Sequence, residues 1–114
     1  MKEKIKVLIL PKIEAGTLGE TSLGEAGLFH KKYTEGGNVY KLPTSTDSNN
    51  CLYVKDGVAL TVTGAAKVNV TIALTSLLCD PRFDFSDAYI VSVGCAGADC
   101  EYSVMGDIYL ASAT

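Results

Sequence analysis

The sequence predicts an α/β domain built around a largely parallel sheet. The first observation is the apolar run Ile5–Leu10 (IKVLIL), which is typical of a strand buried on both faces. The second is the stretch Gly57–Gly97, in which a strand, a glycine turn, a helix, a second strand and a second glycine turn follow one another. Two glycine-ended strands at one edge of such a sheet form a place where a small molecule can approach backbone N–H groups.

Length and charge narrow the class of protein. The chain has 114 residues, enough for one domain. Its net charge is −3, so the chain lacks the excess of basic residues that nucleic-acid binding requires, and we expect no nucleic-acid partner. No stretch reaches the roughly 18 to 20 apolar residues of a membrane span, and the run Val7–Leu10 is too short for the core of a signal peptide. We therefore expect a cytoplasmic or membrane-associated protein without a transmembrane segment of its own.

Cysteine and histidine spacing gives no metal signature. Cysteines stand at positions 51, 79, 95 and 100, and His30 is the only histidine. Without a signal peptide, free thiols are the expectation. Cys95 and Cys100 do not have the CxxC spacing of zinc or redox sites. We expect neither a metal nor a cofactor.

The first half of the chain predicts a loop and a helix. Pro11 ends the first strand, and Lys12–Leu18 forms a loop at its carboxyl end, where sites of α/β proteins usually lie. The segment Ser22–Glu25 matches a capping box and predicts a helix from about Leu23 to Tyr33. Gly36-Gly37 ends that helix.

Short strands follow this helix. Val39–Leu42 is one of them, closed by Pro43. Cys51–Val54 is expected to pair with Val58–Thr63 through the turn Lys55-Asp56-Gly57, because Asp-Gly between two β-rich runs is a hairpin signal.

The segment Ala65–Leu78 has conflicting signals. Its β-branched residues lower the helix propensity, yet its apolar residues repeat at helical spacing and its length exceeds that of a usual strand. We predict a helix that buries one stripe on the sheet. The stripe consists of Ala66, Val70, Ala73, Leu74, Leu77 and Leu78.

The remaining residues predict a connection and two strands. Arg82–Asp87 is read as a connection with two aromatic residues, Ala88–Val93 as a strand and Gly106–Ser112 as a last strand. A domain that stops at a strand is incomplete, so residues 1–114 are expected to form a single partial domain.

Several segments resemble the N-terminal part of the purine nucleoside permease family. They are LYVKDGVALTVTG, AKVN, DPRFDFSDAYIVSVGCAG and YSVMGDIYLASA, and both ILPKIEAG and GEAGLFHKKY fit the same pattern. The resemblance covers nearly the whole chain. Because members of that family are considerably longer, it implies an N-terminal fragment.

That family in turn resembles the nucleoside phosphorylase and nucleosidase superfamily. Thr63-Gly64, Lys67-Val68, Gly94–Gly97 and Met105–Asp107 stand where the superfamily has TG, K, G-(S/T/C)-AG and VGD. This implies a three-layer α/β/α sandwich with a mixed sheet, a purine nucleoside as ligand and phosphate as a second candidate ligand. Ala66 stands where the superfamily usually has glycine, so a left-handed backbone there would be strained.

The resemblance also implies a substrate-binding set and no catalytic residue. The set is Gly64, Lys67, Gly94, Cys95, Ala96 and Gly97. Spacing alone favours turns that need glycine for geometry only. Cys95 is read as a packing residue, since a nucleophile needs a base and His30 is distant in sequence. Lys67 is either solvated or binds an anion at a helix N-terminus. Asp107 caps a turn or faces the site.

Three functions stay open at this point. The first is a purine nucleoside permease-like protein that binds nucleosides for transport, with any membrane span supplied by a partner. The second is a nucleoside phosphorylase or nucleosidase that cleaves the N-glycosidic bond, inactive here because its acidic C-terminal part is missing. The third is a remnant without a function of its own, whose exposed sheet edge favours association and a homo-oligomer.

Overall fold

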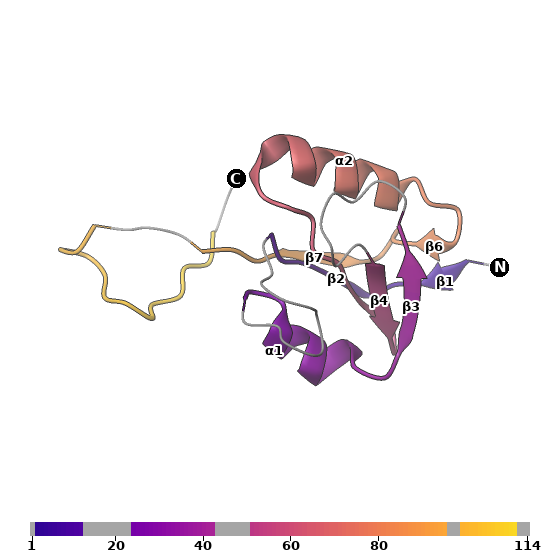
Figure 1. The fold of residues 1–114 in the computed structure, drawn as a ribbon, viewed down its shortest axis with the longest axis horizontal. Helices are drawn as coiled ribbons and strands as arrows, with labels where there is room; N and C mark the ends of the chain where they lie inside the picture. Colours follow the sequence, from indigo (N-terminus) through magenta and orange to yellow (C-terminus); the bar gives the residue numbers. More distant parts are fainter. Residues whose placement is uncertain (1, 13–23, 43–50, 96–98, 112–114) are drawn as a thin grey trace.

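The body of the molecule is a mixed five-stranded sheet (Figure 1). The computed structural model describes residues 2–12, 24–42, 51–95 and 99–111. The strand order is β3-β4-β5-β2-β7, and β2 pairs in parallel with β5 on one side and β7 on the other. β3, β4 and β5 pair antiparallel. The strands are β2 (Val7–Leu10), β3 (Asn38–Lys41), β4 (Cys51–Lys55), β5 (Val58–Leu60) and β7 (Tyr89–Ser92). The predicted α/β class is confirmed.

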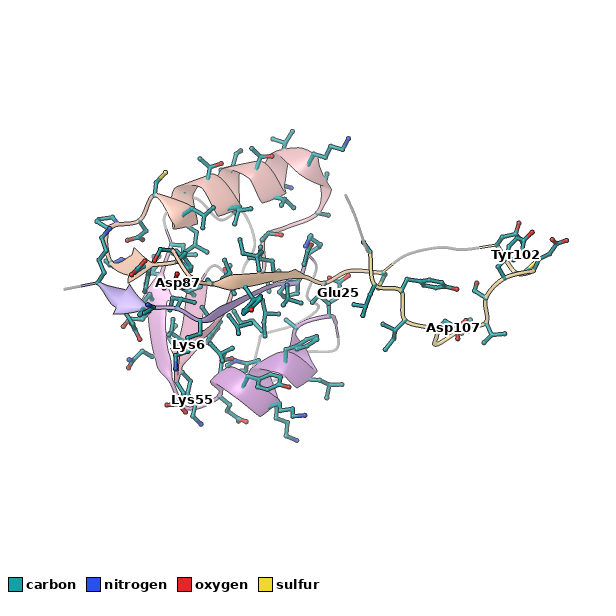
Figure 2. The ribbon with its side chains drawn as sticks, turned by 180° about the vertical axis from the view of Figure 1, so that it is seen from behind. Lys6, Glu25, Lys55, Asp87, Tyr102 and Asp107 are labelled. Carbon is teal, nitrogen blue, oxygen red and sulfur yellow. The ribbon has the colours of Figure 1, made fainter. Side chains whose placement is uncertain are left out.

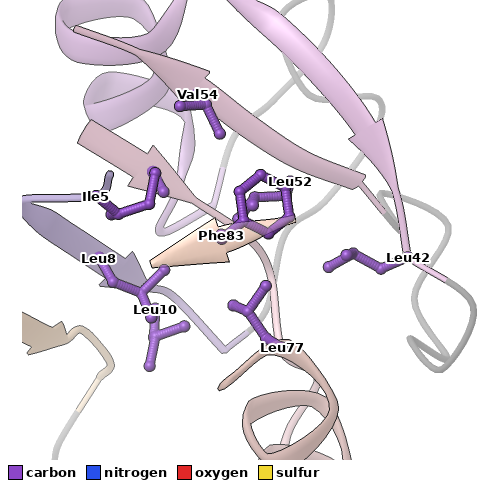
Figure 3. Packing of buried hydrophobic residues seen from close by; sticks show 9 residues of the cluster. Ile5, Leu8, Leu10, Leu42, Leu52, Val54, Leu77 and Phe83 are labelled. Carbon is purple, nitrogen blue, oxygen red and sulfur yellow. The ribbon is translucent and has the colours of Figure 1, made fainter. Parts of the chain in front are cut away.

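Helices cover both faces of this sheet. α2 (Ala66–Leu78) lies on one face, and α1 (Gly27–Phe29) continues into the π-helix η1 (His30–Thr34) on the other (Figure 1). Under α2, Leu77 packs with Leu8 of β2 (Figure 3). The core cluster on this side is Ile5, Leu8, Leu10, Leu42, Leu52, Val54, Ala59, Leu77 and Phe83. Ala26 belongs to a second cluster, with Ile9, Leu60 and Val62.

The hairpin between β4 and β5 has the predicted turn. Asp56 and Gly57 have φ values of +52° and +80°, which suits the left-handed turn that matches strand twist. The predicted strand through Thr63 is regular only to Leu60. Its pairing continues, because the N–H of Thr61 donates to the Ile9 carbonyl and that of Thr63 to the Pro11 carbonyl, at 3.2 and 3.0 Å.

The helix predicted over Ala65–Leu78 is confirmed as α2, while its buried stripe is only partly so. Ala73 and Leu77 are buried. Ala66 and Leu78 face solvent, so their prediction as buried residues was wrong. The helix meets the sheet through a narrower stripe than the apolar spacing suggests.

The helix predicted from Leu23 to Tyr33 begins later, at Gly27. The predicted capping box is therefore wrong, since Glu25 precedes the helix and its carboxylate accepts a hydrogen bond from the Lys12 backbone N–H at 2.8 Å. Residues 13–23 lie outside the described part of the chain. The helix then changes from α to π geometry, because the Glu35 N–H donates to the His30 carbonyl, five residues back. Gly36, at φ +81°, follows its end as predicted.

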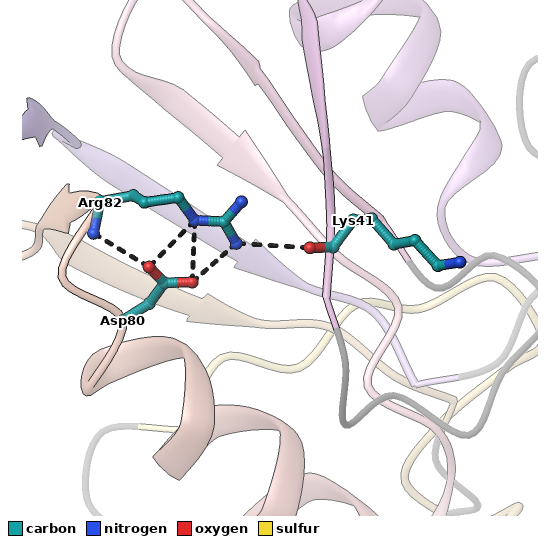
Figure 4. A network of polar contacts seen from close by, with 3 residues as sticks. All are labelled: Lys41, Asp80 and Arg82. Atoms are coloured by element: carbon teal, nitrogen blue, oxygen red, sulfur yellow. Dashed lines mark hydrogen bonds and ion pairs between the residues drawn. The ribbon is translucent and has the colours of Figure 1, made fainter.

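A small second sheet was missed. The predicted strand Ile5–Leu10 is shortened to β2, and a separate strand before it, β1 (Glu3–Lys4), pairs in parallel with β6 (Phe83–Asp84). The segment predicted as a connection therefore contains a strand. Beside it, the Arg82 guanidinium donates to the Asp80 carboxylate at 2.8 Å and to the Lys41 carbonyl at 3.3 Å (Figure 4), which ties the end of α2 to β3.

The strand predicted over Gly106–Ser112 is absent from the described residues, which end at position 111. The Asp107 carboxylate instead accepts a hydrogen bond from the Val104 N–H at 2.9 Å, so Asp107 caps a turn. Residues 99–111 form a loop that projects from the body beyond the end of β7 (Figure 1), and none of these residues is paired in a strand.

Candidate functional site

An open groove lies beside the first turn of α2. Its volume is about 490 Å³, and it is lined by Lys12, Ala66, Lys67, Val70 and Thr71. Because β5, β2 and β7 run in parallel, their carboxyl ends meet at one edge of the sheet, and the chain enters α2 from this edge. Such edges are where open α/β sheets bind ligands.

The turn from β5 into α2 requires glycine at its first position. Gly64 has φ +85°, and a Cβ there would lie 3.2 Å from the Cβ of Asn69. Asn69 is fixed in this place, since its side-chain amide donates to the Ala65 carbonyl at 2.8 Å. Gly64 therefore allows the chain to turn sharply and to pack closely on α2.

Ala66 is in a left-handed conformation, with φ +71°. The strain expected at this position from the resemblance is therefore present; it amounts to roughly 1–2 kcal/mol for an L-residue. The N-cap residue Ala65 makes no side-chain capping bond. The first-turn N–H groups of α2 thus lack that partner and point toward the groove end of the helix.

Lys12 joins the ends of β2 and β7. Its ammonium donates to the Leu10 carbonyl and the Ser92 hydroxyl, both at 2.6 Å, and to the Val93 carbonyl at 3.4 Å. These contacts use the three donors of the ammonium. Burial lowers the pKa of Lys12, while the nearby Glu25 carboxylate opposes that effect. Lys12 therefore positions the strand ends and places a charge at the groove.

Lys67 is exposed and lines the groove from the first turn of α2. Its backbone carbonyl accepts the Thr71 hydroxyl at 2.6 Å, one turn along the helix. The side-chain ammonium of Lys67 and the N-terminal amides of α2 are thus the donors that the groove offers to an anion or to hydroxyl groups.

Of the second glycine turn, Gly94–Gly97, the structure describes only Gly94 and Cys95. Gly94 is exposed, and a Cβ there would meet the Lys12 Cγ at 3.8 Å, an ordinary contact, so the described backbone does not require glycine at this position. Cys95 carries an exposed free thiol. Ala96 and Gly97 lie outside the described residues. Through Lys12, the structure links Gly94 to the groove that contains Lys67.

Sequence reasoning missed Lys12 as a member of the site. The available signal was its position directly after the first strand, within the loop at the carboxyl edge. Its contact with Ser92 joins residues 80 positions apart, which local patterns do not reveal.

Together, the fold and the groove define an α/β protein with room for a small ligand at the carboxyl edge of its parallel strands. The sequence matches the family described as purine nucleoside permease (NUP) over residues 4–114, and the chain belongs to that family. No match was found among curated proteins or among solved structures. Within the described ranges, neither helix has the length and apolar content that crossing a membrane would require.

Proposed function

We propose that this chain binds a purine nucleoside in the groove beside α2, as the nucleoside-binding part of a permease system. Membership of the purine nucleoside permease family supports the ligand class. The observation that carries the proposal is the groove of about 490 Å³, which combines a cation, an uncapped helix N-terminus and apolar wall residues.

The groove has complementary chemistry for a nucleoside. The Lys67 ammonium and the first-turn amides of α2 are donors that suit ribose hydroxyls, or a phosphate as a second ligand. Ala66 and Val70 offer apolar surface for the purine ring. Lys12 contributes by fixing β2 against β7, with its own donors already occupied.

The segment Gly94–Gly97 belongs to the same proposal as the opposite wall. Gly94 lies against Lys12, which supports this position for the wall. The nucleoside phosphorylase-like three-layer sandwich, expected from the resemblance, is likewise proposed on the basis of a helix on each face of the mixed sheet. Bond cleavage gains no support, since none of the groove-lining residues in the described ranges is an acid.

The test is calorimetric titration of the chain with adenosine and guanosine. We expect saturable binding, weakened about tenfold in Lys67→Met, because a hydrogen bond to a charged group contributes about 1.5 kcal/mol. Lys41→Met is the matched control, since Lys41 is an exposed lysine of β3.

Unchanged affinity in Lys67→Met would place the ligand elsewhere. If neither nucleoside binds the folded wild-type chain, the proposed function fails. Adding phosphate during the titration tests the second ligand, which should also lose affinity in Lys67→Met.

A further inference from the structure

We infer that this chain associates with a second copy of itself by exchanging residues 99–111, whose last part pairs with the outer edge of β7. Four observations lead to this interface: a free strand edge, an open apolar cavity beside it, an exposed apolar segment, and acidic residues in that segment opposite a lysine at the cavity rim. The inference is independent of nucleoside binding.

The outer edge of β7 has no partner strand among the described residues. β7 is the last strand in the order β3-β4-β5-β2-β7 and pairs only with β2. Its Tyr89 side chain is 78% exposed, and those of Ile90 and Val91 are 50% and 42% exposed. A free edge with exposed apolar side chains is a template for strand addition, and natural proteins normally cover or charge such an edge.

An apolar cavity opens beside this edge on the face covered by α1 and η1. It measures about 290 Å³ and is lined by Val7, Ile9, Phe29, Tyr33, Val58 and Val91. Because Val91 belongs to β7, the cavity reaches the free edge. A cavity of about 150 Å³ already holds a benzene molecule, so this one has room for two aliphatic side chains.

Residues 99–111 carry apolar side chains that are not buried against the rest of the described chain. Ile108 is 88% and Leu110 93% exposed. The hydrogen bonds that the structure gives this segment stay within it, such as that from the Val104 N–H to Asp107. Tyr102 and Asp107 lie well outside the body (Figure 2).

The segment fits the edge of β7 as an added strand. In an extended chain, alternate side chains point to the same face, so Ile108 and Leu110 would enter the cavity together. Tyr109 would then point to the opposite face, as Ile90 does, because Ile90 pairs with Leu8, a core residue under α2. Ile108 and Tyr109 are also residue types that favour strands.

Charge favours contact between the acidic segment of one copy and the cavity rim of another. Residues 99–111 contain three acids, Asp99, Glu101 and Asp107, and no basic residue, whereas residues 1–98 contain ten basic and ten acidic residues. Asp107 is next to Ile108 in the proposed strand. At the cavity, the exposed Lys32 lies over the ring of Tyr33, at 5.4 Å from its centroid, and thus gives the rim a positive charge. Complementary potentials of this kind guide partner choice.

A second copy is the occupant that satisfies both surfaces at once. In the described part of each copy, the outer edge of β7 and the segment 99–111 are both available, so reciprocal exchange closes a symmetric dimer.

Sedimentation velocity and light scattering on the 114-residue chain test the inference. We expect a dimer at tens of micromolar, and a monomer for the double variant Ile108→Asp with Leu110→Asp. Val104→Asp, also in the segment but before the proposed strand, and Val68→Asp on the exposed face of α2 are the controls and should stay dimeric. A monomeric wild type, or a dimeric double variant, would overturn the inference.

A mixing experiment separates lost association from lost folding. Val91→Asp should be monomeric because it places a charge in the cavity, while its own segment stays intact. Mixed with the double variant, whose cavity is intact, it should form a one-to-one heterodimer through a single exchanged segment. No heterodimer on mixing, or assemblies larger than two copies in the wild type, would contradict reciprocal exchange.

Discussion

Ala66 is the residue at which the backbone of the proposed site is most strained. Its φ of +71° lies in the region that glycine adopts readily. We expect Ala66→Gly to raise the free energy of unfolding by about 0.5–1 kcal/mol, since about 1–2 kcal/mol of strain is relieved and the unfolded chain gains some entropy. Urea denaturation measures the change.

Ala73→Gly is the matched control for Ala66→Gly, because Ala73 is a buried residue in the middle of the same helix. It should lower the free energy of unfolding by at least about 1 kcal/mol. Equal losses for the two variants would contradict the assignment of strain to Ala66.

His30 is expected to titrate below the ordinary pKa of histidine. Burial lowers its pKa, with Glu35 opposing the effect, and its Nδ1 lies 2.8 Å from the Thr34 hydroxyl. Above the usual value of about 6.5, His30 is neutral in both the folded and unfolded chain. As the pH falls from there through the lower folded pKa, the unfolded chain takes up the proton first, so stability is lost.

An NMR titration checks this directly, because the chain has a single histidine. In parallel, the loss of stability between pH 7 and pH 5.5, roughly the range of this titration, should be smaller in His30→Gln. A His30 pKa at or above 6.5, the ordinary value for histidine, would contradict the prediction.

At the scale of elements, the sequence predicted those whose signals are local. The hairpin around Asp56-Gly57 is encoded by the turn residues themselves, and α2 by apolar spacing over 13 residues. β1 and β6 were missed, because two-residue strands exist only through pairing between Glu3 and Phe83, 80 positions apart. The strand predicted from Gly106 was wrong for the same reason, since β-propensity does not make a strand without a neighbour.

The candidate site shows the same difference between local sequence signals and contacts that depend on the fold. Gly64 and Lys67 were proposed from the family resemblance, and the structure places Gly64 at the turn into α2 and Lys67 on the groove. Lys12 was missed, because its role depends on Ser92 and on the parallel pairing of β2 with β7. Whether Ala66 had a left-handed backbone could be posed as a question from the sequence, but only the fold answers it.

The docking of α2 depends on its buried stripe rather than on its apolar content. Leu77 is 1% exposed and packs in the core, while the adjacent Leu78 is 44% exposed. We expect Leu77→Ala to lower the free energy of unfolding by about 3 kcal/mol, through lost burial and a residual cavity. Leu78→Ala, the matched control, should lower it by less than about 1 kcal/mol. Denaturant unfolding compares them, and similar losses would contradict the narrow stripe.

In the whole molecule, β2 is the strand on which the fold depends. It pairs on both sides, with β5 and β7, and its Leu8 and Ile9 side chains belong to the clusters on opposite faces of the sheet. β3 is an edge strand paired only with β4, and its Val39 is exposed. Opening β2 therefore disrupts two ladders and both clusters, whereas β3 can open locally.

Native-state hydrogen exchange should reveal this order. We expect the amides of Leu8 and Ile9 to exchange at rates set by global unfolding, at least about ten times more slowly than that of Val39 in β3. Leu77→Ala should then speed exchange at Leu8 by the factor that matches its loss of global stability, because the two residues share one cluster. Exchange at Val39 should change less. Equal protection of β2 and β3 would mean that the sheet opens as one unit, and the central position of β2 would then have no separate energetic role.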